Sequence, residues 1–177
     1  FFSTLRAERC LTQLLSERDP ASPEGRKALE SLRSIGPEAI PKVIEAFATA
    51  DKEHTGAMVT LLASLLDDKT FPLFTAGLGH TDKLCVAGVT KALAISANYD
   101  TNRLTELLGR PEIFKPALIE ILGIVRKRLN ARELLKRAYD LEPREKAAVF
   151  KIIGDIAGPD LVPDLIARIE GKDPSVR

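Results

Sequence analysis

The segment SIGPEAIPKVIEAF spans Ser34 to Phe47, and a closely similar segment, IAGPDLVPDLIARI, spans Ile156 to Ile169. Both contain a Gly-Pro pair, a second proline four residues after the first, and apolar residues at matching positions. Pro37 and Pro159 have the placement of prolines that begin a helix rather than break one. The offset of 122 residues is close to four periods of 30 or 31, which predicts further copies of one unit between the two segments.

Weaker copies lie between the two segments at this period. The stretch from Phe71 to Leu78 repeats the apolar pattern of Ile40 to Phe47, with Pro72 in the place of Pro41. The later copies keep the apolar positions and lose the prolines, which is typical of units that preserve packing rather than a reaction. These apolar positions are Leu104 and Leu108 in one copy, then Leu134 or Leu135 and Ala138 in the next.

The stretches between these copies have apolar residues at helical spacing, as in Phe114, Leu118, Ile121 and Val125. We expect first helices at residues 27–35, 54–66, 82–96, 111–125 and 145–157, each with one buried stripe. No segment has the alternation and turn residues of a strand or a hairpin.

Helix start and stop signals agree with this interpretation. Ser22 followed by Pro23 indicates an N-cap with proline in the first helical turn. Asn130 with Glu133 three residues later is typical of a capping box, and Gly109 indicates a helix end.

The sequence therefore predicts an all-α fold. A two-helix unit of about 30 residues cannot bury both of its faces alone, so neighbouring units are expected to stack into a right-handed α-α superhelix, or solenoid. We expect a single array over residues 1–177, with an N-terminal capping helix at 3–16. The five repeats are expected at about 22–49, 52–79, 81–109, 111–140 and 142–171, and residues 172–177 would start a further repeat.

The last seven residues, GKDPSVR, resemble the opening of a HEAT-like repeat, and Asp82 and Cys85 stand at matching positions of an earlier copy. The two similar segments resemble the turn and second helix of the same repeat, in the short bacterial form of phycobilin-lyase-like HEAT proteins. The resemblance extends from about Glu24 onward and is strongest in the first and fifth repeats. It implies an armadillo-like α-solenoid, whose usual role is protein binding.

The chain begins with Phe1, and its one methionine is Met58. Together with the repeat that begins at 172–177, this predicts a fragment of a longer protein.

Composition favours some classes of function over others. Lys and Arg total 26 and Asp and Glu total 25, so a net charge of +1 gives no general attraction for a polyanion. Cys10 and Cys85 each lie alone in an apolar helical context, which predicts buried, reduced thiols and a cytoplasmic location. No apolar run approaches the ~18 residues of a membrane span, and no signal peptide is visible, so we expect no membrane partner.

Catalytic patterns are weak. The histidines are His54 and His80, and the His-Glu pairs that bind iron in HEAT-like metal oxygenases do not occur, so we expect no metal or cofactor and no enzymatic activity. Two alternatives stay open. A HEAT-like DNA-repair or other nucleic-acid-binding protein is disfavoured by the lack of tryptophan and of a basic track, and for a HEAT-like lyase no chromophore-contacting residues can be placed.

One cationic cluster has a net charge of +5 over residues 126–137. It is either a solvated edge that complements the C-terminal end of the preceding helix, or an anion patch that binds an acidic peptide or phosphate. Its members are Arg126, Lys127, Arg128 and Arg132, with Lys136 and Arg137, opposed in sequence by Glu133.

The second helices are expected to form a concave face that binds a protein or peptide, or a neighbouring domain. Leu73 and Ala76 are apolar where the matching residues of other repeats are charged, so Leu73 is either packed between units or an apolar anchor in a polar rim. The predicted partner-binding residues are Lys42, Glu45, Leu73, Arg103, Glu106, Lys136, Arg137, Asp164 and Arg168. The sequence thus predicts a non-enzymatic protein-interaction scaffold.

Overall fold

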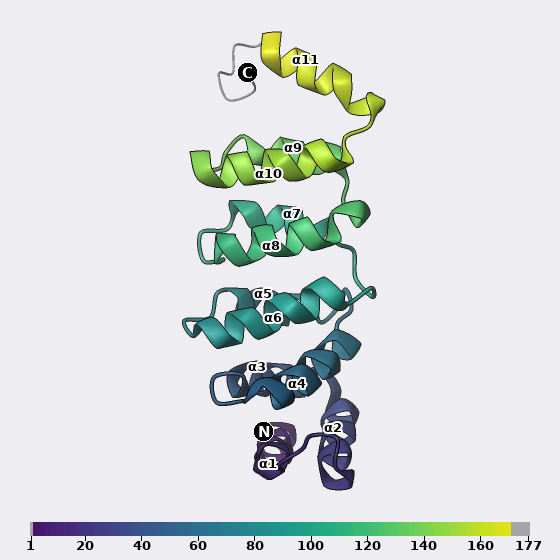
Figure 1. Ribbon diagram of the computed structural model, residues 1–177, viewed down its shortest axis with the longest axis vertical. Helices are drawn as coiled ribbons and strands as arrows, with labels where there is room; N and C mark the ends of the chain where they lie inside the picture. Colours follow the sequence, from purple (N-terminus) through teal and green to yellow (C-terminus); the bar gives the residue numbers. More distant parts are fainter. Residues whose placement is uncertain (1, 171–177) are drawn as a thin grey trace. The chain divides into compact units, whose positions relative to one another are not determined.

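The computed structural model describes the backbone of residues 2–170 and the side chains up to Ala167. Every regular element in this part of the chain is an α-helix or a short 3-10 helix, which confirms the prediction of an all-α fold (Figure 1). The chain divides into two compact units, Phe1–Tyr99 and Asp100–Arg177. The single array expected over residues 1–177 stays a prediction. The repeat expected to begin at 172–177 lies outside the described residues.

The first unit consists of helices that pack mainly on their neighbours in sequence. α1 packs on α2 and α3, α3 packs on α5 and α6, and α4 packs on α6. The elements are α1 (Phe2–Ser16), α2 (Pro23–Ile35), η1 (Gly36–Ala39), α3 (Ile40–Ala46), α4 (Lys52–Leu65), α5 (Phe71–Leu78) and α6 (Lys83–Ile95).

The second unit is built in the same sequential way. α10 packs on α8 and α9, and α7 packs on α8 and α9. Its elements are α7 (Arg103–Glu106), η2 (Leu107–Gly109), α8 (Lys115–Val125), η3 (Arg126–Arg128), α9 (Ala131–Ala138), α10 (Pro143–Ile156), η4 (Pro159–Leu161) and α11 (Val162–Glu170).

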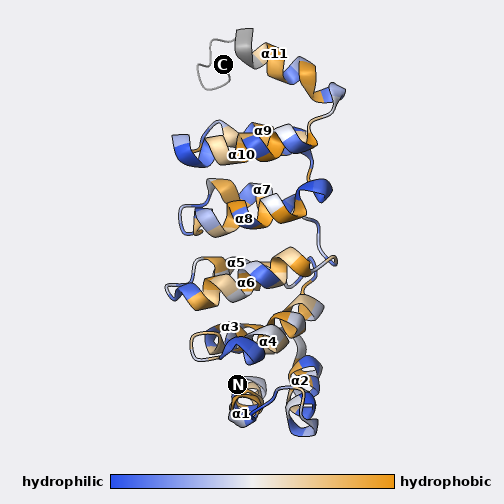
Figure 2. Cartoon of the chain, viewed as in Figure 1, coloured by the Kyte–Doolittle hydropathy of each residue, from blue (hydrophilic) through white to orange (hydrophobic). Residues whose placement is uncertain are grey.

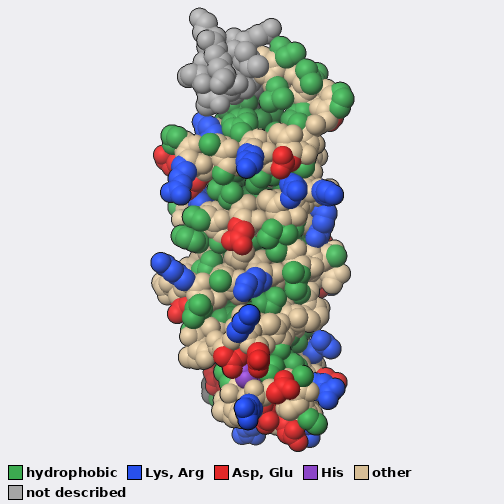
Figure 3. Space-filling view, viewed as in Figure 1, with side chains coloured by type: hydrophobic (Ala, Val, Ile, Leu, Met, Phe, Trp, Pro, Cys, Tyr) green, Lys and Arg blue, Asp and Glu red, His purple; other side chains and the backbone are tan. Residues whose placement is uncertain are grey.

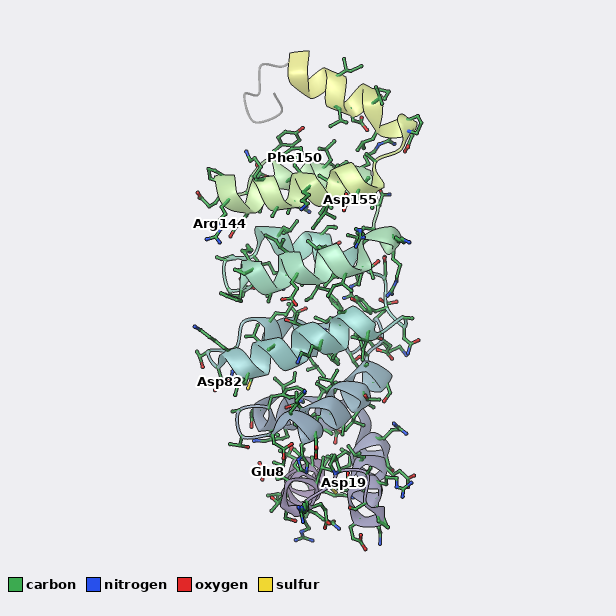
Figure 4. The ribbon with its side chains drawn as sticks, viewed as in Figure 1. Glu8, Asp19, Asp82, Arg144, Phe150 and Asp155 are labelled. Atoms are coloured by element: carbon green, nitrogen blue, oxygen red, sulfur yellow. The ribbon has the colours of Figure 1, made fainter. Side chains whose placement is uncertain are left out.

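Side-chain caps fix where several helices begin. The Ser22 hydroxyl accepts a hydrogen bond from the Gly25 N–H at 3.0 Å, which confirms Ser22 as the N-cap of α2. Asp82 caps α6 in the same way (Figure 4). Asn130 caps α9 by accepting from the N–H groups of Arg132 at 3.0 Å and Glu133 at 3.3 Å.

One of the two hydrogen bonds of the predicted capping box at α9 does not form, namely the bond from the Asn130 N–H to the Glu133 side chain, so this part of the prediction is wrong. The Glu133 carboxylate pairs with Lys136 at 2.7 Å instead of returning to the Asn130 backbone. The Asn130 N–H donates instead to the Asn102 side-chain oxygen, at 2.7 Å. A contact with the region before α7 therefore replaces the local one.

Three predicted boundaries need correction. The helix expected at 111–125 begins at Lys115. The prediction started too early because Ile113 is buried although it lies in a turn, and its spacing fits the helical pattern. The second helix of the third repeat is one α-turn, α7, that tightens into η2 and ends at Gly109 as predicted. Pro37 and Pro159 are the second residue of η1 and the first residue of η4, and α3 and α11 start only after these 3-10 turns.

The two aligned glycines of the similar segments differ in backbone conformation. Gly36 has φ 76°, in the region that favours glycine, and its N–H bonds to the Leu32 carbonyl at the end of α2. Gly158 has φ −102° and ψ 176°, an extended conformation open to any residue. The turn before α3 and the turn before α11 are therefore built differently, despite the similar sequence.

Apolar stripes on successive helices form the core of each unit, and Figure 2 shows them along the helices. In the first unit Phe47 and Phe74 are among the largest fully buried side chains. Phe47 lies against Gly88 of α6, where a Cβ would stand 2.4 Å from the ring. The close approach of α6 to the end of α3 thus depends on the absence of a side chain at residue 88.

Candidate interaction surface

A groove between α1 and α3 contains two of the predicted partner-binding residues, Lys42 and Glu45. We call it the α1/α3 groove. Its volume is about 390 Å³. It is lined by Glu8, Leu11, Thr12 and Leu15 of α1 and by Lys42, Glu45 and Ala46 of α3.

An ion-pair network crosses this groove. The Lys42 ammonium lies 3.0 Å from Glu8 Oε1 and 2.9 Å from Glu45 Oε2. Hydrogen bonds to Glu45 and then to Glu8 raise the pKa of Lys42. Glu8, which extends from α1 (Figure 4), therefore joins the site although its helix was expected only to cap the array.

A second groove, the α9/α11 groove, contains the predicted residues Lys136 and Asp164. Its volume is about 180 Å³, and Arg132, Leu135 and Ala167 complete its lining. The Arg132 Nε donates to Asp164 Oδ2 at 2.7 Å, and its Nη2 donates to the Asp160 carbonyl at 3.1 Å. Arg132 thus ties α9 to the turn and first residues of α11.

Carboxylates from α10 and α11 offset the cationic cluster at 126–137. Arg126 Nε lies 3.5 Å from Asp155, which extends from the end of α10 (Figure 4), and Arg132 pairs with Asp164. Arg126 also donates to the Gly123 carbonyl at 2.8 Å, in the last turn of α8, as the solvated-edge interpretation expected. The fold thus brings two aspartates from outside residues 126–137 to oppose this cluster, in addition to Glu133.

The other cluster residues have separate positions. Lys127, Arg128 and Arg137 are exposed, and the Arg128 carbonyl accepts a hydrogen bond from the Thr101 hydroxyl at 2.7 Å. Figure 3 shows positive and negative side chains interspersed among apolar ones on the viewed face of each unit. An anion patch at Arg126, Lys127, Arg128 and Arg132 stays a prediction. The ion pairs of Arg126 and Arg132 with aspartates reduce the net positive charge that this patch would offer to an anion.

Leu73, Arg103, Glu106 and Arg137 lie outside the linings of these two grooves. Leu73 is half-buried on α5 while Ala76 is exposed. Arg103 is half-buried and Glu106 is exposed, both on the single turn of α7. The side chain of Arg168 lies outside the described residues.

The histidines and cysteines have structural contacts. His54 is buried in α4, with Nδ1 2.8 Å from Asp51 Oδ1 and Nε2 3.1 Å from the Leu14 carbonyl of α1. The His80 Nδ1 accepts from the Asp82 N–H at 3.0 Å. Both cysteines are free, but only Cys85 is buried, and burial raises the pKa of its thiol. The prediction of a buried Cys10 is wrong, because this side chain is half-exposed at the surface of α1.

Among the side chains up to Ala167, no group of three or more His, Cys, Asp or Glu residues is placed to hold a metal ion. No helix within residues 2–170 combines the length and the apolar character needed to cross a membrane.

Sequence reasoning missed Glu8, Leu11 and Leu15 as groove residues. The signal that could have identified them is charge complementarity between neighbouring units, since Glu8 lies roughly one repeat before Lys42 and Arg132 one repeat before Asp164. No protein-family model, curated protein or solved structure matches the chain. The resemblance to HEAT-like repeats stays a prediction.

Proposed function

We propose that this chain is a non-enzymatic protein-interaction scaffold, a HEAT-like α-solenoid whose second helices receive a partner protein or a neighbouring domain. The observation that carries the proposal is the placement of predicted residues in two grooves. Lys42 and Glu45 line the α1/α3 groove, and Lys136 and Asp164 line the α9/α11 groove. Each groove is built from a second helix and the helix one repeat before it.

The composition of these grooves supports protein recognition. Leu15 and Ala46 expose apolar surface in the first groove above the buried Leu11. Ala167 does so in the second groove beside the buried Leu135. Partly exposed ion pairs border both linings. An apolar centre within a polar rim is the usual construction of a protein-protein interface.

The finer fold belongs to the same proposal. Sequential packing of α1 to α6 and of α7 to α11 agrees with stacked two-helix repeats. A right-handed superhelix and a cytoplasmic location are parts of this proposal that rest on the sequence resemblance and on the unpaired cysteines.

Affinity capture with matched charge reversals tests the scaffold. The tagged wild-type chain, the Glu45→Lys, Lys136→Glu double variant and a Glu30→Lys, Lys151→Glu control would capture proteins from a lysate for quantitative mass spectrometry. Glu30 and Lys151 are exposed on the first helices α2 and α10. We expect the control to retain the wild-type set and the groove variant to lose it.

Equal recovery by all three chains would show that the second-helix face is not the binding surface. Recovery of nucleic acid instead, with affinity that falls steeply between low and moderate salt, would favour the nucleic-acid-binding alternative.

A further inference from the structure

Two solvent-accessible carboxylates, those of Glu8 and Glu45, lie next to apolar side chains in the α1/α3 groove. Lys42 bonds to Oε1 of Glu8 and Oε2 of Glu45, while the other carboxylate oxygen of each glutamate accepts no hydrogen bond from the described residues. Two carboxylates and one ammonium leave the lining with a net charge of −1. The groove is therefore complementary to a cation.

The two carboxylates are held in position before any ligand arrives. Lys42 has 28% of its side chain exposed and bridges α1 to α3, whereas Glu8 and Glu45 are 47% and 56% exposed. The ammonium is thus the more shielded member, and the carboxylates remain accessible to solvent. Fixing the acceptors in advance lowers the entropic cost of binding.

Leu11, Leu15 and Ala46 set a second requirement on the ligand. A hydrated inorganic cation would gain nothing from contact with these side chains, whereas a long side chain with a charged end would cover them with its methylene groups. The volume of about 390 Å³ is within the range of ligand clefts, about 300–1,000 Å³.

We infer that the α1/α3 groove binds an arginine side chain of a partner protein. The guanidinium has five N–H donors in a planar fork and can bond to both free carboxylate oxygens at once, while its stem lies on the half-buried Leu15 and Ala46. A lysine ammonium is a compact, strongly hydrated point charge and matches two separated carboxylates less well. This inference rests on the proposed function and specifies the chemistry of the partner.

A peptide titration followed by NMR tests the inference on the full 177-residue chain. The probes are N-acetyl-Ala-Arg-Ala-amide, its lysine counterpart and its citrulline counterpart, which keeps the shape of arginine without the charge. We expect saturable shifts of backbone amides in α1 and α3 with the arginine peptide, and binding at least about tenfold weaker with the other two.

Two variants complete the experiment. Glu8→Gln with Glu45→Gln should weaken binding of the arginine peptide by about tenfold, whereas Glu30→Gln with Glu38→Gln, exposed in the same unit, should leave it unchanged. Citrulline or lysine binding equal to that of arginine overturns the inference, even if a variant fails to fold. Unchanged binding by the Glu8→Gln, Glu45→Gln chain, or no saturable shift in α1 and α3, also overturns it.

The failure of this inference is distinguishable from failure of the scaffold proposal. If arginine recognition fails while capture of proteins still depends on Glu45 and Lys136, only the inference is lost. If capture does not depend on these two residues, the proposed function itself is lost.

Discussion

Gly88→Ala is expected to destabilise the first unit because the added methyl group meets the Phe47 ring. The new Cβ would lie 2.4 Å from two ring carbons and 2.6 Å from Cγ, whereas ordinary contacts are 3.4–4 Å. Phe47 is 1% exposed, and contact with Cγ leaves the ring little freedom to rotate away. The ring or helix α6 must therefore move.

The magnitude follows from two opposing effects. Overpacking a well-packed core costs about 1–3 kcal/mol. Replacing glycine by alanine inside a helix stabilises the folded state by about 1 kcal/mol. Since the contact is far shorter than normal, we place the packing cost at the upper end and expect a net loss of roughly 1–2 kcal/mol.

Urea unfolding followed by far-UV circular dichroism measures the effect, with amide hydrogen exchange to report on α3 and α6. Gly56→Ala is the matched control, because Gly56 is exposed inside α4 with open space around its Cβ position. It should stabilise the chain by up to about 1 kcal/mol. In a Phe47→Leu background, Gly88→Ala should become much less harmful. A stabilising Gly88→Ala in the wild-type chain would refute the described packing of α6 on α3.

Three further outcomes are expected. Asn130→Ala should destabilise the second unit by about 1 kcal/mol in urea unfolding, since α9 loses its cap; no change would contradict the capping role. Asp164→Ala should change unfolding free energy by less than about 1 kcal/mol, because its pair with Arg132 is about half exposed; a larger loss would show that the pair holds α11 in place. Hydrogen bonds from backbone N–H groups lower the pKa of Asp51 and Asp67, so their stabilisation should be full above about pH 4 and fall as the pH drops through the lowered folded-state values. Urea midpoints measured against pH should flatten in an Asp51→Asn, Asp67→Asn variant, and an unchanged profile would contradict this assignment.

Local patterns predicted the helices well because each helix depends on nearby residues. Ser22 and Asn130 cap α2 and α9 as expected, since a cap involves residues within one turn. The error at 111–114 arose because Ile113 is buried without being helical. Hydrophobic spacing reports burial, and burial is not limited to helices.

The candidate site was predictable only in part. Lys42, Glu45, Lys136 and Asp164 were named from their places beside core residues, and they line the two grooves. Two of their ion-pair partners come from distant sequence: Glu8 pairs with Lys42, and Arg132 pairs with Asp164 across a separation of 32 residues. Such pairs depend on how helices stack on one another, and the residue pattern of a single helix does not contain this information.

The close contact between Gly88 and Phe47 could not be predicted from the sequence either. Gly88 is an ordinary interior helix residue by composition, and only the position of Phe47 shows why a methyl group would not fit. Gly36 and Gly158 occupy equivalent positions in similar segments, yet only Gly36 has a positive φ. Two segments of similar sequence can therefore form turns of different conformation.

The α1/α3 groove is lined by two separate parts of the chain. Both parts must be included if the groove is to be transferred to another protein. Glu8, Leu11 and Leu15 come from α1, whereas Lys42 and Glu45 come from α3. Grafting the α2–α3 pair onto an unrelated repeat protein would transfer one wall of the groove and leave Lys42 without Glu8. The smallest segment that carries both walls of the groove is therefore α1 through α3, and engineered chimaeras should be joined after Phe47 rather than before Ser22.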